Sequence, residues 1–303
     1  MQLNVRPLAN NWRIFVVSVR LIFSNNREPL YKQKHKLNLA FLERAVALPA
    51  DSEEEMPVET FRIWVMWWQG EAGMPDVIRA TYDSIRRAAA CEVVLITKDN
   101  YTEWVTLPDY MTAKIDSGKI KLPQLSDIIR ASLLYEYGGM WIDSTMLCIA
   151  KIPATVYHTD FFTIKDGNCK TAKYVPCGRW NGQLMATAKR HLELYRCVRH
   201  ILYDYWRKYD YLMDYLLVDY SIAYTYDKKA KTRALIDSVK PSNPNTHDLL
   251  PMMNDAYDEA TYAAMSKANI FFKLTYKKAY ADLCGGKPTY YSVLISHNQP
   301  SAI

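Results

Sequence analysis

The chain has 303 residues, of which 50% are hydrophobic and 23% are charged, and its formal net charge at pH 7 is +6. This composition is typical of a globular protein with one large or two small domains. The charge is moderate and comes without a basic low-complexity tail. It therefore favours an anionic ligand or an anionic membrane surface over dedicated nucleic-acid binding.

Residues 1–56 are predicted to form an N-terminal helical extension that ends in an acidic linker. Within it, Trp12–Phe23 is apolar but too short to span a bilayer, and Arg13 and Arg20 interrupt it. The pattern alone favours a helix that packs at the edge of the domain. Because the two arginines share one helical face, the segment would alternatively lie on a membrane surface. We therefore expect a cytoplasmic protein, with peripheral attachment to the inner face of the membrane as the alternative.

Residues 57–303 are predicted to form one domain that begins with alternating strands and helices. Dense apolar or β-branched runs indicate the strands, and a proline in a first turn marks a helix start. This alternation predicts right-handed crossovers and a parallel sheet. The expected elements are a strand over Phe61–Trp68, a helix over Pro75–Ala89, a strand over Glu92–Thr97 and a short helix over Pro108–Ser117.

The most informative stretch is the run that follows these elements. Asp127 and Arg130 lie three residues apart in a mostly apolar run, which places both side chains on one face of a helix. The pair Gly138-Gly139 ends this helix, and a short apolar strand then runs to Asp143. Open α/β sheets bind their ligands at the carboxyl ends of strands, so this carboxylate marks a candidate site.

The rest of the chain is expected to be mainly helical, with no internal repeat. The six cysteines show no metal-binding spacing and are predicted to be reduced core residues. The expected elements are a strand over Phe161–Ile164, helices over Gln183–Tyr209 and Asp210–Tyr226, a loop over Pro241–Pro251, a helix from about Asp255 and a strand over Thr289–Ser296.

A family resemblance is carried by three motifs: Ser126-Asp127-Ile128-Ile129-Arg130, Tyr137-Gly138-Gly139 and Trp141-Ile142-Asp143-Ser144-Thr145. Together they resemble the sugar-binding segment of the family 32 glycosyltransferases and, more closely, that of the bacterial capsular polysaccharide synthesis proteins. Weaker motifs extend the resemblance to roughly residues 60–280. They are Trp67-Trp68-Gln69-Gly70, Met74-Pro75, Leu217-Val218-Asp219-Tyr220, Asn243 to Leu249 and Lys273-Leu274-Thr275-Tyr276-Lys277.

The resemblance implies an α/β nucleotide-diphospho-sugar transferase fold of the GT-A type. Its central sheet would be mostly parallel, with helical additions at both ends. Residues 57–303 would then be a catalytic domain with a nucleotide-sugar-binding half at about 60–165 and an acceptor-side helical half at about 166–303.

The resemblance also implies a metal site. In the family, an Asp-x-Asp pair holds a divalent cation, Mn²⁺ or Mg²⁺, that bridges the two phosphates of the donor. By position Asp143 is the first ligand, whereas Thr145 stands where the family has its second acid. Thr145 would contact a metal-bound water or a phosphate, or act as a spacer. His297, late in the chain, is the candidate third ligand, with an ordinary surface histidine as the alternative.

Further roles follow for the donor and acceptor. Asp127 and Arg130 would clamp the donor sugar, since a guanidinium donates in a fork and a carboxylate accepts; an intrahelical ion pair is the alternative. By family position Trp67 would stack on the base, and only one of Trp67 and Trp68 can do so, because neighbouring strand residues point apart. The alternative is that both rings pack in the core. Asp99 and Asn100 are weaker candidates, for the ribose or base or as plain turn residues. Asp219 is expected either as a catalytic carboxylate near the sugar or acceptor, or as a helix cap or core hydrogen-bond partner.

The predicted function is a glycosyltransferase that moves a sugar from a nucleotide-sugar donor to a saccharide or lipid-linked saccharide acceptor. The resemblance implies metal dependence and retention of the anomeric configuration, in the synthesis of a capsular or other surface polysaccharide. The alternative is a catalytically silent nucleotide-sugar-binding homologue, which the loss of the second acid at Thr145 motivates.

Overall fold

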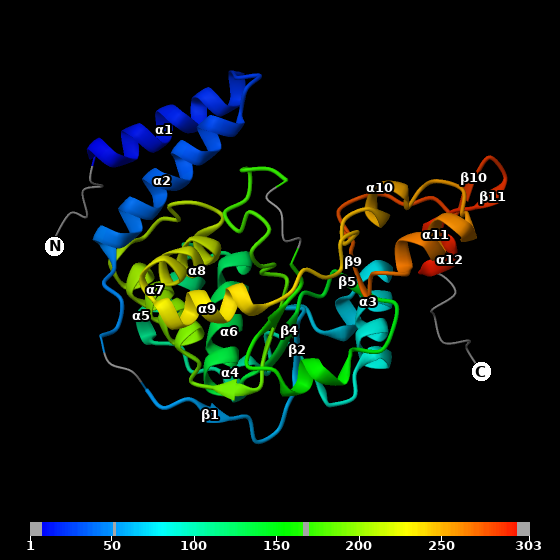
Figure 1. Ribbon diagram of the computed structural model, residues 1–303, viewed down its shortest axis with the longest axis horizontal. Helices are drawn as coiled ribbons and strands as arrows, with labels where there is room; N and C mark the ends of the chain where they lie inside the picture. Colours follow the sequence, from blue (N-terminus) through cyan, green and yellow to red (C-terminus); the bar gives the residue numbers. More distant parts are fainter. Residues whose placement is uncertain (1–7, 51–52, 166–169, 296–303) are drawn as a thin grey trace.

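The computed structural model describes residues 8–50, 53–165 and 170–295. Its centre is a five-stranded sheet in the order β3–β2–β4–β7–β6 (Figure 1). The pairings of β2 with β3 and β4 are parallel, whereas those of β7 with β4 and β6 are antiparallel. The expected α/β class is confirmed, but the sheet is mixed rather than mostly parallel. The strands are β2 (Ile63–Met66), β3 (Val93–Ile96), β4 (Gly139–Ile142), β6 (Phe162–Thr163) and β7 (Leu184–Thr187).

Helices cover both faces of this sheet (Figure 1). Because side chains alternate along a strand, Trp64 and Met66 of β2 pack on one face, while Ile63 and Val65 pack on the other. The first face is covered by α6, α7 and α8 and the second by α3. These helices are α3 (Asp76–Ala88), α6 (Leu122–Glu136), α7 (Glu193–Lys208) and α8 (Leu217–Lys228), and α9 (Ala230–Ser238) follows α8 directly.

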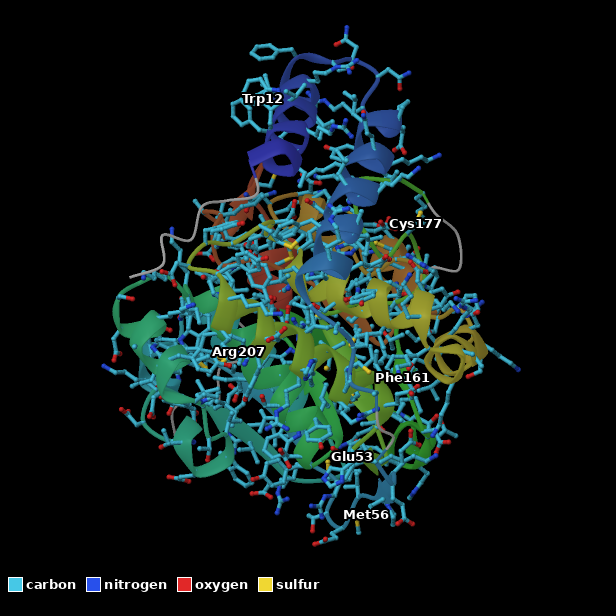
Figure 2. All side chains as sticks on the ribbon, turned by 90° about the vertical axis from the view of Figure 1, so that its left-hand side faces the viewer. Trp12, Glu53, Met56, Phe161, Cys177 and Arg207 are labelled. Carbon is cyan, nitrogen blue, oxygen red and sulfur yellow. The ribbon has the colours of Figure 1, made fainter. Side chains whose placement is uncertain are left out.

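The chain enters this core through two N-terminal helices, α1 (Leu8–Phe23) and α2 (Glu28–Ala45), which pack against each other. Asn38 of α2 is buried and donates to the hydroxyl of Tyr220 in α8 at 2.8 Å. The end of the expected acidic linker is not solvated, since Glu55 forms an ion pair with Lys231 at 2.7 Å and its side chain is only 9% exposed. Figure 2 shows α1 and its Trp12 at the end of the molecule opposite Met56.

The last part of the chain forms a separate small cluster beside α3, on the right of Figure 1. Its centre is an antiparallel pair in which β9 (Phe271–Lys273) joins β5 (Met146–Cys148), the strand that follows the candidate site. The helices here are α10 (Leu249–Met252), α11 (Glu259–Ser266) and α12 (Tyr290–Leu294).

The remaining elements are short. The strand pair β1–β8 joins the start of the domain to the end of β7, and β10–β11 is a small hairpin. Their bounds are β1 (Met56–Pro57), β8 (Lys189–Arg190), β10 (Leu283–Cys284), β11 (Lys287–Pro288), α4 (Tyr101–Trp104), α5 (Asp109–Asp116) and the 3₁₀ turns η1 (Glu71–Gly73) and η2 (Ala154–His158).

Three expected elements are wrong. The helix expected over Gln183–Tyr209 begins only at Glu193, because its first residues form β7 against β4. The next helix begins at Leu217 rather than Asp210. The strand expected over Thr289–Ser296 is instead the helix α12, whose start is capped by the Thr289 side chain, which accepts from the Ser292 amide. Here tertiary packing overrides the β-propensity of tyrosine and valine.

The glycine pair between α6 and β4 fixes where the candidate strand begins. Gly138 and Gly139 have φ angles of +65° and +87°, which side-chain-bearing residues rarely adopt. A Cβ on Gly139 would lie 2.3 Å from the Arg62 carbonyl oxygen, so only glycine permits this approach to the chain entering β2. The glycine pair therefore fixes the start of β4, and with it the position of Asp143, which follows the end of the strand.

The cysteines only partly follow the expectation of reduced core residues. Cys148 and Cys197 are free and buried, as expected. Cys284 is free but exposed, and Cys177 is disulfide-bonded, so the expectation is wrong for these two. Within the described ranges, none of the helices has the length and apolarity needed to cross a bilayer.

Candidate functional site

A cavity of about 840 Å³ opens at the carboxyl ends of β2 and β4. The ends of these two parallel strands meet at the same edge of the sheet, where ligands bind in open α/β folds. The cavity brings together seven of the candidate residues: Trp67, Trp68, Asp127, Arg130, Asp143, Thr145 and Asp219. Asp99 and Asn100 are not among its lining residues, and His297 lies outside the described residues.

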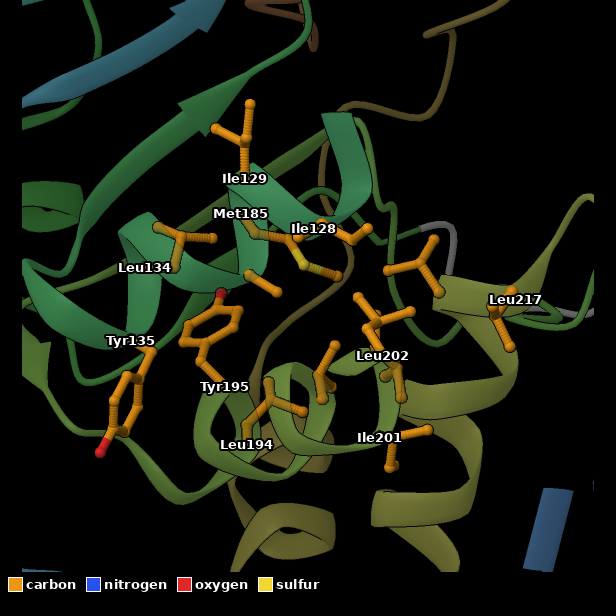
Figure 3. Close-up of a cluster of buried hydrophobic side chains, with 14 of the residues drawn as sticks. Ile128, Ile129, Leu134, Tyr135, Met185, Leu194, Tyr195, Ile201, Leu202 and Leu217 are labelled. Carbon is orange, nitrogen blue, oxygen red and sulfur yellow. The ribbon is translucent and has the colours of Figure 1, made fainter. Parts of the chain in front are cut away.

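The helix α6 holds one wall of the cavity in place by packing its opposite face. Figure 3 shows Ile128 and Leu134 of α6 facing Tyr195 and Leu202 of α7 in a buried apolar cluster. Because Asp127 and Arg130 lie on the other side of the same turns, this packing fixes them toward the cavity.

Arg130 is the centre of the polar part of the site. Its guanidinium donates to the carboxylate of Asp127, one turn earlier in α6, and to the carbonyl oxygen of Gly182. A third contact, at 3.9 Å, reaches Oδ1 of Asp143. The guanidinium also lies 5.6 Å from the ring centroid of Trp141, close enough for a cation–π contact. A buried arginine thus links the helix face to the strand end.

Burial shifts the protonation of the carboxyl groups around Arg130. Burial raises the pKa of Asp127 to about 7; the Arg130 charge opposes this shift, and the nearby Asp219 and Asp143 add to it. Burial also raises the pKa of Asp219, although the Trp180 N–H and Arg130 act in the opposite direction. Burial alone would lower the pKa of Arg130, but the surrounding carboxylates raise it, so the guanidinium stays charged.

Asp219 lies at the start of α8 and reaches the same wall of the cavity. Its Oδ1 accepts from the indole N–H of the buried Trp180 at 2.9 Å. A Cβ on Gly182 would lie 3.7 Å from both this oxygen and the Arg130 guanidinium, so the absence of a side chain at Gly182 leaves the space between the two groups open. The structure therefore places Asp219 beside the Asp127–Arg130 pair, near which the sequence predicts a buried carboxylate.

Asp143 is held at the end of β4 by contacts on both oxygens. Oδ1 accepts from the indole N–H of Trp141 at 2.9 Å, and Oδ2 lies 3.3 Å from the ammonium of Lys273. The same ammonium donates to the hydroxyl of Thr145. Lys273 was missed as a site residue by the sequence reasoning. Its only signal was its place in one of the weaker family motifs.

These contacts bear on the implied metal site. A divalent Mg²⁺ or Mn²⁺ needs several oxygen ligands, usually with more than one carboxylate or phosphate among them. Around Asp143 the described donors are one carboxylate and the hydroxyl of Thr145, and both already contact the Lys273 ammonium. Among residues 8–50, 53–165 and 170–295, no three His, Cys, Asp or Glu side chains gather in a metal-binding group. Without phosphate oxygens from a donor, this set of one carboxylate and one hydroxyl does not by itself make up a site for a divalent cation.

The two tryptophans after β2 diverge, as neighbouring extended residues must. Trp67 packs edge-on against Tyr276, with ring centroids 5.2 Å apart, and donates to the Gly73 carbonyl at 3.1 Å. Trp68 packs instead beside Tyr101 on the other side of the sheet, at 5.3 Å. Both rings are partly exposed at the cavity.

Asn100 has a local role in a turn after β3. Its side chain accepts from the Thr97 amide at 2.8 Å and donates to the Leu95 carbonyl at 2.9 Å. These contacts close the turn and match the plain-turn alternative for this residue. Asp99 is its immediate neighbour in the same turn.

The fold and cavity define an α/β protein with a charged ligand site at the edge of its sheet. Over residues 19–294 the chain matches the family model described as capsular polysaccharide synthesis protein, and it belongs to that family. The expected family is thereby confirmed. No curated protein matches the chain significantly.

Among solved structures, the chain is similar to the PaToxG glycosyltransferase, at 11% identity and a TM-score of 0.41 over 75% of this chain and 84% of that one. It is also similar to the WbbM bifunctional glycosyltransferase in its apo structure, at 12% identity and a TM-score of 0.41. That match covers 84% of this chain but only 51% of WbbM. Both likenesses are remote, and no residue role is carried over from them.

Proposed function

We propose that this member of the capsular polysaccharide synthesis family is a glycosyltransferase of the GT-A type that uses a nucleotide-sugar donor. The observation that carries the proposal is the cluster of Asp127, Arg130 and Asp143 in one cavity at the carboxyl ends of two parallel strands. A fixed guanidinium beside carboxylates offers both donors and acceptors to sugar hydroxyls, so it can orient a sugar ring.

In this proposal the donor lies along the edge of the sheet. The ring of Trp67 stacks on the nucleotide base, and the diphosphate lies near the end of β4. Arg130 and Asp127 hold the sugar, with Asp219 on the side of the acceptor. Asp127, with a pKa raised to about 7, can exchange a proton near neutral pH and so can either donate to or accept from a sugar hydroxyl.

The transfer itself breaks the bond between the anomeric carbon and the diphosphate and forms a bond to an acceptor hydroxyl oxygen. The proton of that hydroxyl passes to the departing phosphate. We propose retention of the anomeric configuration from the family resemblance. An acceptor that is a saccharide or a lipid-linked saccharide fits a cavity of this size, which leaves room beside a donor.

The surface of α1 supports a peripheral membrane position. Trp12, Phe15, Ile22 and Phe23 are 64%, 58%, 68% and 81% exposed, and their spacing places all four on one helical face. The exposed Arg13 and Arg20 flank this apolar face. Aromatic and aliphatic side chains beside arginines are the pattern of a helix that lies in an anionic membrane surface. A lipid-linked acceptor would be presented at such a surface.

The proposal is tested by nucleotide release from a panel of UDP-, GDP-, CDP- and ADP-sugars, with and without saccharide acceptors. Release from one donor that is lost in Arg130→Met and Asp143→Ala supports the transferase. Binding of a donor without release in any mixture would favour the alternative, a catalytically silent homologue, which Thr145 in place of the second acid motivates. If no nucleotide sugar binds, the proposal is wrong.

A further inference from the structure

We propose that the ammonium of Lys273, rather than a divalent cation, neutralises the donor's diphosphate at the end of β4. This inference rests on the proposed function and concerns the same cavity. It starts from one geometric fact: the ammonium lies between Oδ2 of Asp143 and the hydroxyl of Thr145. In this chain, the place where an Asp-x-Asp pair would hold a cation already contains one.

The position of Lys273 is fixed by its backbone. Its amide donates to the Thr246 carbonyl at 2.7 Å, and the next amide, of Leu274, donates to the Thr145 carbonyl at 2.9 Å. In the β5–β9 pair, Lys273 stands opposite Met146, the residue after Thr145. The side chain therefore starts from a sheet position beside the site.

The charge and exposure of Lys273 suit a phosphate. Its side chain is 18% exposed, and Lys273 reaches the cavity through its two contacts, Asp143 and Thr145, which line it, although Lys273 itself is not a lining residue. An ammonium has three N–H donors, and Asp143 and Thr145 take two of them, which leaves one to point to a phosphate oxygen. Asp143 then acts as the group that positions the ammonium, and Thr145 acts as a second acceptor that a carboxylate could not replace without adding charge.

The identity of residue 145 also favours an ammonium over a divalent cation at this place. A second carboxylate there would surround one ammonium with two negative charges and would favour a divalent ion. Threonine keeps an oxygen at that position but adds no charge. One carboxylate and one ammonium together are neutral, so the pair carries no net negative charge that would attract a divalent ion.

During transfer, the ammonium would stabilise the negative charge that develops on the diphosphate as its bond to the anomeric carbon breaks. The acceptor oxygen takes over that bond, and its proton goes to the released diphosphate. Lys273 keeps its own proton throughout and acts only through its charge and its N–H bonds.

The test measures binding of ADP, CDP, GDP and UDP to the full chain by calorimetry, in EDTA and in Mn²⁺. We expect one nucleotide to bind with the same affinity in both conditions. Lys273→Met, which keeps the aliphatic stem, should weaken this binding by about 10- to 100-fold, and Lys273→Arg should weaken it less. The matched control is Lys278→Met, a change at an exposed lysine five residues further on, which should leave the affinity unchanged.

A double variant designed to make nucleotide binding depend on Mn²⁺ provides a second test. Thr145→Asp combined with Lys273→Met recreates two acids and removes the ammonium, so its nucleotide binding should become dependent on Mn²⁺. Wild-type binding that requires Mn²⁺ would overturn the inference while leaving the proposed function standing, and this result does not depend on whether Lys273→Met folds. If no nucleotide binds under either condition, the proposed function fails, and the inference fails with it.

Discussion

Arg130 donates to the carboxylate of Asp127 one turn earlier in α6, and the arginine side chain is only 9% exposed. The same spacing recurs on α7, where Arg207 donates to Asp204 but is 64% exposed. Two ion pairs of the same spacing thus differ in the exposure of the arginine, and Asp204 has a second cation, Lys208, at 2.7 Å. Comparing the two pairs therefore tests how burial changes the contribution of a salt bridge to the free energy of unfolding.

We expect Arg130→Met to lower the free energy of unfolding by about 3–5 kcal/mol, because it leaves Asp127 buried without its counterion. Arg207→Met should cost less than about 1 kcal/mol, as is usual for an exposed pair. Urea denaturation followed by circular dichroism measures both. Equal losses in the two variants would mean that Arg130 is no more buried in solution than Arg207.

The raised pKa of Asp127 predicts a pH dependence of stability. The pKa of this carboxyl group is about 7 in the folded protein, against an unperturbed value of 3.8. Between pH 3.8 and pH 7 the folded state therefore binds more protons than the unfolded state. Its contribution to stability is therefore full below about pH 4 and is lost as the pH rises toward 7. In Asp127→Asn this loss should disappear. The measurement is the difference in unfolding free energy between wild type and variant from pH 4 to pH 8, and a difference that does not change with pH would contradict the prediction.

Gly139→Ala should destabilise the protein strongly. The new Cβ would lie 2.3 Å from the Arg62 carbonyl, so the entry to β2 or β4 must move. We expect a loss of about 3 kcal/mol or more, in the range of overpacking plus left-handed strain. Gly118→Ala is the control, since its φ is +70° but nothing lies within 4 Å of its added Cβ. That variant should lose only about 1–2 kcal/mol, from strain alone. Similar thermal shifts for both would show that the close approach at Gly139 is absent.

Much of the sheet could be predicted from the sequence, for a local reason. Runs such as Ile63–Met66 and Val93–Ile96 are short, apolar and bounded by turn residues, so each reads as a buried strand on its own. The strand β7 could not be found in this way. Its residues Leu184, Met185 and Ala186 are good helix formers directly before a true helix, and only pairing with β4 makes them a strand.

The same distinction between local and long-range information applies to the residues of the site. Asp127, Arg130 and Asp143 lie within one contiguous motif, whose spacing already places the first two on one helix face and the third at a strand end. Lys273 is 128 residues away from Thr145 in the chain, and no local pattern reveals that contact. The Trp180–Asp219 hydrogen bond spans 39 residues and was likewise invisible. Long-range pairing of β5 with β9 supplies the first of these contacts, and sequence periodicity carries no information about it.

Trp67→Ala should weaken binding of the nucleoside diphosphate identified above by about 5- to 150-fold, the usual value of one base stacked on an aromatic ring. Trp68→Ala should have a smaller effect, because that ring packs beside Tyr101. Calorimetric titration of both variants separates the two positions. A larger loss in Trp68→Ala would move the base to the other side of β2.

The exposed face of α1 predicts binding to vesicles that contain an anionic lipid. Phe15→Asp and Phe23→Asp together should reduce co-sedimentation with phosphatidylglycerol vesicles by at least about tenfold, because they remove apolar area and add repulsion. Nucleotide binding in solution should not change, since α1 lies away from the cavity-lining residues. Retained sedimentation in the double variant would exclude α1 as the membrane contact.

The pairing of β5 with β9 has a consequence for a chain that is still being made. Asp127, Arg130 and Asp143 are synthesised by position 143, but the lysine beside Asp143 and the strand that carries it come only at 271–273. A ribosome-bound chain shorter than this lacks the β9 edge and leaves β5 unpaired, and pairings so distant in sequence form slowly. If the ammonium completes the proposed donor site, the growing polypeptide is unable to hold a donor there until β9 has been made.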